Sequence, residues 1–188
     1  MATITPGDVV FGKNTTGGDE VQRWSKLPTH YDKVKEFATL AGNVVPTAPE
    51  LPDPATALLC ARLIMEEAME TVAALGVSLR LKPEFARSEL LNFTDLCFEV
   101  TAQPNLVGVI DGACDTRVVS TFTMVMCGVH DGVPQELVDN NNLGKFTAPG
   151  GRRCQVTGKW LKPPNYQPPD LRSEIIRQGW RPPPTTSD

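Results

Sequence analysis

Apolar residues recur at helical spacing along most of the chain after the first 28 residues. Thr29-His30-Tyr31-Asp32 matches a capping box, and the apolar stripe that follows it ends at Gly42, which predicts a short first helix. Asp53-Pro54 is a strong helix start, because Asp accepts from unpaired backbone N–H groups and Pro loses no hydrogen bond at the first helical position. We therefore expect a second helix from about Ala55 to Leu75, stopped by Gly76.

Three later segments complete the expected helices. Lys82-Pro83-Glu84 opens a third one, whose apolar residues continue to about Thr101. The β-branched residues of 106–129 favour a strand by propensity. However, a run of 24 residues is too long for a typical strand, and Gly128 stands at its end, where a glycine commonly follows a helix. We expect a helix there, and a last short helix near 134–142.

The two ends of the chain have a different composition. Residues 1–28 lack a sustained hydrophobic period and are expected to form an irregular N-terminal arm. Residues 147–188 are rich in Gly, Pro and basic side chains, and we expect this extension to wrap the domain without forming a helix or a central strand. The prediction is therefore an all-α helical bundle over residues 29–146, flanked by two extensions.

Length and charge narrow the classes of protein. A chain of 188 residues is long enough for one domain with its own core. A net charge of −4 argues against binding polymeric DNA or RNA, which calls for a clustered basic face. We see no secretion signal and no apolar run of 18 residues, so neither membrane insertion nor export is expected, and the five widely spaced cysteines are expected to stay reduced in the cytoplasm.

A narrow acidic stripe runs along the second predicted helix. At about 100° per residue, Glu66, Glu67 and Glu70 fall with Arg62 within an arc of about 140°, and the rest of the helix is almost wholly apolar. Neighbouring carboxylates repel each other, and a hard divalent cation with oxygen ligands neutralises them. The alternative is that these residues form the solvated face of a surface helix.

A second pair of acids strengthens the metal hypothesis. Asp111 and Asp115 are one turn apart on the 106–129 segment, in line with an apolar stripe, which is unusual for a solvated face. The alternative here is that both simply decorate the first turns of a helix, where its dipole favours carboxylates.

The order of these motifs resembles the MazG-like and phosphoribosyl-ATP pyrophosphohydrolase-like family, in the branch common in phages. The resemblance spans about residues 34–171. It rests on five matching segments: Val34-Lys35-Glu36-Phe37, Arg62 to Glu70 with its EExxE, Asp111 to Asp115, Asn142-Leu143-Gly144-Lys145, and Gly158 to Leu171 with its Lys162, Tyr166 and Pro168-Pro169-Asp170. EExxE alone occurs by chance in many helices, whereas five segments in this order are specific.

The resemblance implies a helical bundle in which two acidic helices face each other and bind Mg²⁺ or Mn²⁺. Glu67, Glu70 and Asp115 would be metal ligands, and Glu66 a further ligand or the base that orients water. The family's second motif is ExxD, but this chain has Gly112 three positions before Asp115 and the acid one residue earlier, at Asp111. A shift of one residue turns a helical side chain by about 100°, so Asp111 would replace the missing ligand only with some adjustment.

The same resemblance assigns the substrate side. Lys145 and Lys162 would neutralise phosphates, Asn142 would hydrogen-bond near them, and Tyr166 would stack on the nucleotide or enclose it. The implied reaction splits a nucleoside triphosphate into monophosphate and pyrophosphate. One branch, MazZ, converts (d)GTP to (d)GMP, which makes a guanine nucleotide the expected substrate. Alternatives are a house-cleaning or pyrimidine deoxynucleotide pyrophosphatase, or a non-enzymatic helical interaction module.

Self-association is also expected. Several predicted helices are apolar nearly all round, so a single chain would expose much hydrophobic surface. The resemblance implies dimers or tetramers.

Overall fold

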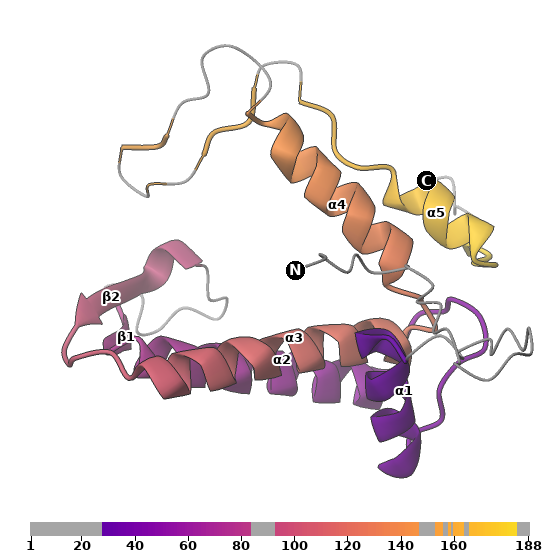
Figure 1. Cartoon of the computed structure of the whole chain (residues 1–188), viewed down its shortest axis with the longest axis horizontal. Coiled ribbons are helices and arrows are strands. Elements are labelled where there is room, and N and C mark those ends of the chain that lie inside the picture. The colour runs from indigo at the N-terminus through magenta and orange to yellow at the C-terminus, as the bar shows by residue number, and fades with distance from the viewer. Residues whose placement is uncertain are drawn as a thin grey trace, which may run out of the picture.

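The computed structural model of the chain describes residues 28–83, 93–146, 153–155, 158, 160–163 and 166–183. The predicted N-terminal arm, residues 1–28, therefore lies outside the described residues except for Pro28. Over the described part, two long helices lie side by side, a short helix crosses one end of them, a small sheet closes the other end, and two further helices rise from the pair (Figure 1).

The starts and stops of the first two predicted helices are confirmed. Helix α1 (His30–Leu40) follows the Thr29 capping box, in which Asp32 bonds back to the Thr29 backbone. Helix α2 (Pro54–Ala74) begins after Asp53, whose carboxylate accepts from the N–H groups of Ala55 and Thr56. Gly76, after α2, has φ of +74°, a conformation that costs a glycine little.

Helix α3 (Leu106–Met126) confirms the choice of helix over strand for the β-branched segment. It runs antiparallel to α2, since the Asn105 N–H donates to the Ala74 carbonyl at one end and the Glu50 N–H donates to the Cys127 carbonyl at the other. Burial of Val119, Phe122, Val125 and Met126 in the C-terminal half of α3 outweighs the modest strand propensity of its valines and threonines. Helix α4 (Gly132–Gly144) extends the predicted short helix by two residues at each end.

The predicted third helix is wrong. Where it was expected, the described residues form a short 3-10 turn (Phe93–Asp95) and strand β2 (Leu96–Val100), and residues 84–92 of the predicted helix lie outside the described part. Strand β2 pairs antiparallel with β1 (Val77–Leu81), with Leu79 opposite Phe98. The described fold is therefore mostly helical with a two-stranded sheet, and not purely all-α. Strand pairing between distant segments decided this, and helical spacing of apolar residues alone does not reveal it.

The expectation of no helix in the C-terminal extension is also wrong. Helix α5 (Leu171–Arg177) lies between two proline-rich segments, and Asp170 caps it by accepting a hydrogen bond from the Ser173 N–H. Its Glu174 is buried and accepts two hydrogen bonds from Arg177, at 2.7 and 2.8 Å. A cap and an internal ion pair therefore stabilise a helix in a segment where the proline content argued against one.

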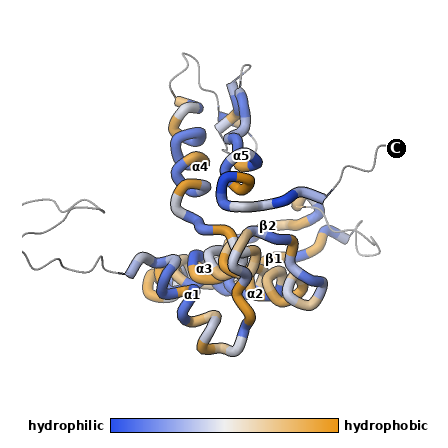
Figure 2. Tube along the Cα trace, turned by 90° about the vertical axis from the view of Figure 1, so that its right-hand side faces the viewer, coloured by the Kyte–Doolittle hydropathy of each residue, from blue (hydrophilic) through white to orange (hydrophobic). Residues whose placement is uncertain are grey.

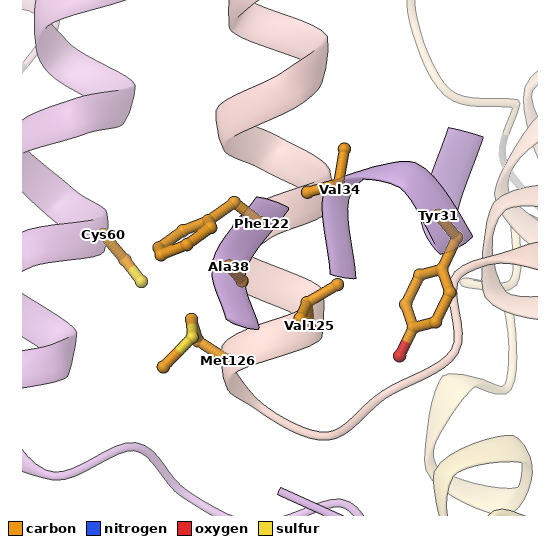
Figure 3. Packing of buried hydrophobic residues seen from close by; sticks show 7 residues of the cluster. All are labelled: Tyr31, Val34, Ala38, Cys60, Phe122, Val125 and Met126. Atoms are coloured by element: carbon orange, nitrogen blue, oxygen red, sulfur yellow. The ribbon is translucent and has the colours of Figure 1, made fainter. Parts of the chain in front are cut away.

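The core lies where α1 crosses the pair. Val34 and Ala38 of α1 meet Phe122, Val125 and Met126 of α3, and Cys60 completes the cluster from α2 (Figure 3). This packing fixes one end of the α2–α3 pair. No helix among the described residues is both long and apolar enough to cross a membrane.

Candidate active site

The α2–α3 pair approaches closely at Gly112. A Cβ added to Gly112 would lie 2.5 Å from Thr71 Oγ1 and 3.1 Å from Thr71 Cα, so the two backbones approach more closely here than any other residue type allows. One turn on, the hydroxyls of Thr71 and Thr116 are 3.4 Å apart. The Thr71 hydroxyl also donates to the Glu67 carbonyl at 2.7 Å. These contacts set the rotation of both helices about their axes.

The close approach explains the departure from ExxD. An acid at position 112 would be directed into α2 and would collide with Thr71, so in this helix pair the position is closed to any side chain. Asp111, one residue earlier, lies instead on the exposed side of α3 with Asp115. Gly112 is therefore a packing residue of the α2–α3 pair.

The predicted acids of the two helices share one electrostatic environment. Desolvation, and then the negative charges of Asp115, Glu70, Glu66 and Asp111, raise the pKa of Glu67 above its ordinary value. Glu67 is partly buried between the helices, and the other four side chains are exposed around it. The structure thus brings the five predicted acids into one group, which we call the acid cluster.

The donor set of the acid cluster is made of carboxylate oxygens alone. Such a set suits Mg²⁺ or Mn²⁺, which prefer oxygen ligands, and a cation would relieve the repulsion that raises the pKa of Glu67. Among the residues that the structure describes, no three His, Cys, Asp or Glu side chains are grouped closely enough to hold a metal ion in their present rotamers.

The predicted substrate residues gather at a second place, the C-terminal end of α4. Lys145 Nζ donates to Asn142 Oδ1 at 2.7 Å. The ammonium groups of Lys145 and Lys162 lie 5.8 and 4.6 Å from the centre of the Tyr166 ring. All four residues, which the resemblance selected from segments 20 residues apart, are thus neighbours.

Three further residues close to this group in the chain contact one another, and one of them, Trp160, belongs to a segment on which the resemblance rests. Phe146 and Trp160 are in edge-to-face contact, with ring centres 4.8 Å apart, and the Arg153 guanidinium lies 5.0 Å from the Trp160 ring. Arg153 and Trp160 also form an isolated antiparallel bridge. We call these residues, with Lys145, Lys162 and Tyr166, the basic–aromatic cluster. Basic and aromatic residues alternate in these parts of the sequence, and this pattern could have indicated the cluster. The end of α4 and the C-terminal extension meet, however, only because the extension folds back.

The two clusters lie on different parts of the chain. The acid cluster belongs to the α2–α3 pair, whereas α4 packs mainly against α5 and both rise away from that pair (Figures 1 and 2). The acids predicted to bind metal thus lie in one cluster, and the residues predicted to bind substrate lie in another. No contact between described side chains joins the two clusters.

A scan against protein-family models finds no match for this chain, and a search of curated proteins finds none either.

Proposed function

We propose that the chain is a metal-dependent nucleoside triphosphate pyrophosphohydrolase, which splits the bond between the α and β phosphates. The observation that carries the proposal is the acid cluster: carboxylates from two antiparallel helices surround Glu67 and raise its pKa. A group of like charges held on rigid helices is unfavourable by itself and becomes favourable when a divalent cation binds. The resemblance to MazG-like enzymes, and to their (d)GTP-cleaving branch, supplies the reaction and the guanine preference.

The residues of the acid cluster have distinct roles in this proposal. Glu67, Glu70, Asp111 and Asp115 would hold Mg²⁺ or Mn²⁺, with Glu66 as a further ligand or as the base. Such a cation neutralises charge on the phosphoryl oxygens. Glu66, exposed at the edge of the cluster, orients a water molecule and accepts its proton as the water oxygen bonds to phosphorus and the bridging oxygen leaves with the other phosphate.

The basic–aromatic cluster binds the substrate. Two lysine ammoniums lie near one ring, and cations so placed suit the phosphate chain of a nucleotide. Asn142 holds the Lys145 ammonium in place through its 2.7 Å hydrogen bond. Tyr166 offers a ring face for stacking or for enclosing the nucleotide.

A homo-oligomer, dimer or tetramer, is part of the proposal. Leu58, Met65 and Met69 form a stripe on the face of α2 opposite Glu67, and each is more than half exposed. Contiguous exposed apolar surface of this kind is typical of association sites.

A product assay tests the function. The eight common ribo- and deoxynucleoside triphosphates are incubated with the chain and Mg²⁺ or Mn²⁺, and monophosphate plus pyrophosphate is resolved from diphosphate plus phosphate. We expect monophosphate and pyrophosphate, fastest from GTP or dGTP. Glu66→Gln, which removes the proposed base, should lower the rate by about 10²–10⁴-fold, and Glu67→Gln should lower it by weakening metal binding. Glu136→Gln, at an exposed acid on α4, should leave the rate unchanged.

Other outcomes lead to the alternatives. Turnover of a pyrimidine or damaged nucleotide alone would replace guanine by that base within the same reaction. Absence of turnover together with absence of divalent-cation binding in calorimetry would contradict the enzyme proposal and leave the helical interaction module.

A further inference from the structure

An open cavity lies beside the start of α2, apart from both clusters. Its volume is about 580 Å³, within the range of roughly 300–1,000 Å³ that small-molecule sites occupy. One wall is the connection that leads into α2, and the other is the segment that follows α5. The side chains that give the cavity its chemistry are Pro49, Glu50, Leu51, Trp180, Arg181 and Pro183.

Backbone hydrogen bonds hold both walls of the cavity in place. The Glu50 N–H donates to the Cys127 carbonyl at 3.0 Å, which ties the first wall to the end of α3. The Trp180 N–H donates to the Ile175 carbonyl at 2.9 Å, which ties the second wall to α5. The walls are therefore anchored before any ligand arrives, and this lowers the entropy that binding must overcome.

Trp180 gives the cavity a stacking surface. Its side chain is half-buried, and the Arg172 guanidinium lies 5.4 Å from the ring centre. Pro49, Leu51 and Pro183 line the same cavity with apolar groups. An indole among apolar neighbours suits a flat ligand such as a nucleobase, because every base has a π face that stacks on an aromatic ring.

One cation and one carboxylate complete the lining. Among the residues that the structure describes, neither Arg181 nor Glu50 forms an ion pair, so both charges are available to a ligand. A guanidinium matches the geometry of a phosphate, and a carboxylate accepts hydrogen bonds from N–H groups. Guanine presents two neighbouring N–H donors on one edge, whereas adenine presents an acceptor beside its amino group, so Glu50 favours guanine.

We propose that this cavity is a second nucleotide-binding site. It takes a nucleoside phosphate with the base against Trp180, the phosphate at Arg181 and, for guanine, the edge of the base at Glu50. The ligand class follows from a stacking ring, a cation and a carboxylate that line one cavity with anchored walls. The site is independent of the proposed reaction, because it uses no residue of the acid cluster or of the basic–aromatic cluster.

Both clusters lie away from the cavity. Glu67 follows the start of α2 by roughly 20 Å along the helix axis. The segment after α5 is tied to the beginning of α4, because the Gln178 side chain bonds to the N–H and the carbonyl of His130. Lys145, by contrast, follows the other end of α4. A nucleotide in the cavity is therefore distinguishable from one bound at Lys145.

The fluorescence of Trp180 tests the site. The sequence has three tryptophans, so a chain with Trp24→Phe and Trp160→Phe keeps Trp180 alone. Titration with GMP or AMP in chelator excludes metal-dependent turnover, and we expect saturable quenching at lower concentrations of GMP than of AMP. The matched chain with Trp24→Phe and Trp180→Phe reports on Trp160 and thus on the basic–aromatic cluster.

Two results of this titration would overturn the proposal. One is the absence of saturable quenching of Trp180 by either nucleotide. The other is a change in Trp180 emission with a proline-rich peptide and not with GMP, which would make the cavity a peptide groove.

Calorimetry repeats the test on chains that keep all three tryptophans. The background carries Lys145→Gln and Lys162→Gln, which removes the two ammonium groups of the basic–aromatic cluster. Arg181→Gln should raise the Kd for GMP by about tenfold or more, because it removes a charged contact to the phosphate. Glu50→Gln should remove most of the preference for GMP over AMP.

A matched control and two outcomes complete the experiment. Glu136→Gln, at an exposed acid on α4, should change neither the Kd nor the preference. An unchanged Kd for GMP in Arg181→Gln would contradict the proposed site. GMP binding in this background, together with no turnover in the product assay, would count against the proposed reaction alone.

Discussion

The α2–α3 pair and the α4–α5 arm are both helical, yet different forces hold them. The pair is joined by close backbone approach at Gly112 and by the apolar cluster around Phe122. The arm depends more on polar contacts: Glu174 accepts from Arg177 and Gln178, and Gln178 bonds to both the N–H and the carbonyl of His130. Figure 2 shows the same contrast in hydropathy, with more hydrophilic positions on the arm.

This difference bears on the role of each part. The apolar cluster makes the α1 end of the pair firmly packed, because such cores deform little. A part held mainly by exposed hydrogen bonds opens more easily and gains more when another surface packs on it. The pair is thus the more firmly packed part, and the arm is the part that should open more easily.

The largest expected effect is a difference in the stability lost when an apolar side chain is removed from the α2–α3 pair or from the arm. Phe122→Ala removes a buried ring from the cluster that joins α1 to α3 and should lower the free energy of unfolding by about 3–5 kcal/mol. Ile176→Ala, on the partly exposed face of α5, should cost about 1 kcal/mol or less. Urea unfolding followed by circular dichroism measures both. Equal losses would show that the arm is as tightly packed as the pair.

A smaller effect distinguishes two helical glycines. Gly112→Ala forces α2 and α3 apart, because the new Cβ would lie 2.5 Å from Thr71 Oγ1, and should cost about 1–3 kcal/mol. Gly144→Ala meets nothing within 4 Å at the end of α4 and should stabilise the chain by up to about 1 kcal/mol. Thermal unfolding of both variants provides the measurement. A neutral Gly112→Ala would mean that the helices separate easily and that the acids are less firmly placed.

The smallest effect is a pH dependence of opposite sign in the two parts. The pKa of Glu67 is raised above 4.5, first by desolvation and then by its acidic neighbours, so its ionisation destabilises the fold as pH rises through the folded value. The pKa of Glu174 is lowered below 4.5, chiefly by the hydrogen bonds from Arg177, so its contribution is present above pH 4.5 and lost as pH falls through the folded value.

Two substitutions reveal these signs. At pH 7, in chelator, Glu67→Gln should melt at a higher temperature than the parent chain, and Glu174→Gln should melt lower or show faster amide exchange in α5. Both differences should shrink once the pH falls below the folded pKa of the group concerned. A Glu67→Gln chain less stable than the parent at pH 7 would show that the carboxylate is not crowded by like charges.

Much of the fold was readable from local signals. The Thr29 capping box, the Asp53-Pro54 start and the glycines at 76 and 128 predicted the bounds of three helices, because each acts through the backbone of its own turn. The strand pairing of Leu79 with Phe98 was not readable, since it joins segments 19 residues apart and neither segment is specific by itself. Helix α5 was missed because proline content was weighed over a whole segment, although its seven residues contain no proline.

For the candidate site, too, the sequence determined some features and the tertiary structure decided others. The sequence by itself determined which residues have the chemistry: the carboxylates at helical spacing, and the lysines and tyrosine of the extension. Only the tertiary structure decided that Gly112 serves packing, that desolvation and neighbouring carboxylates raise the pKa of Glu67, and that Arg153 stacks on Trp160. The physical reason is that charge and periodicity belong to single segments, whereas close approach, desolvation and stacking arise only when distant segments meet.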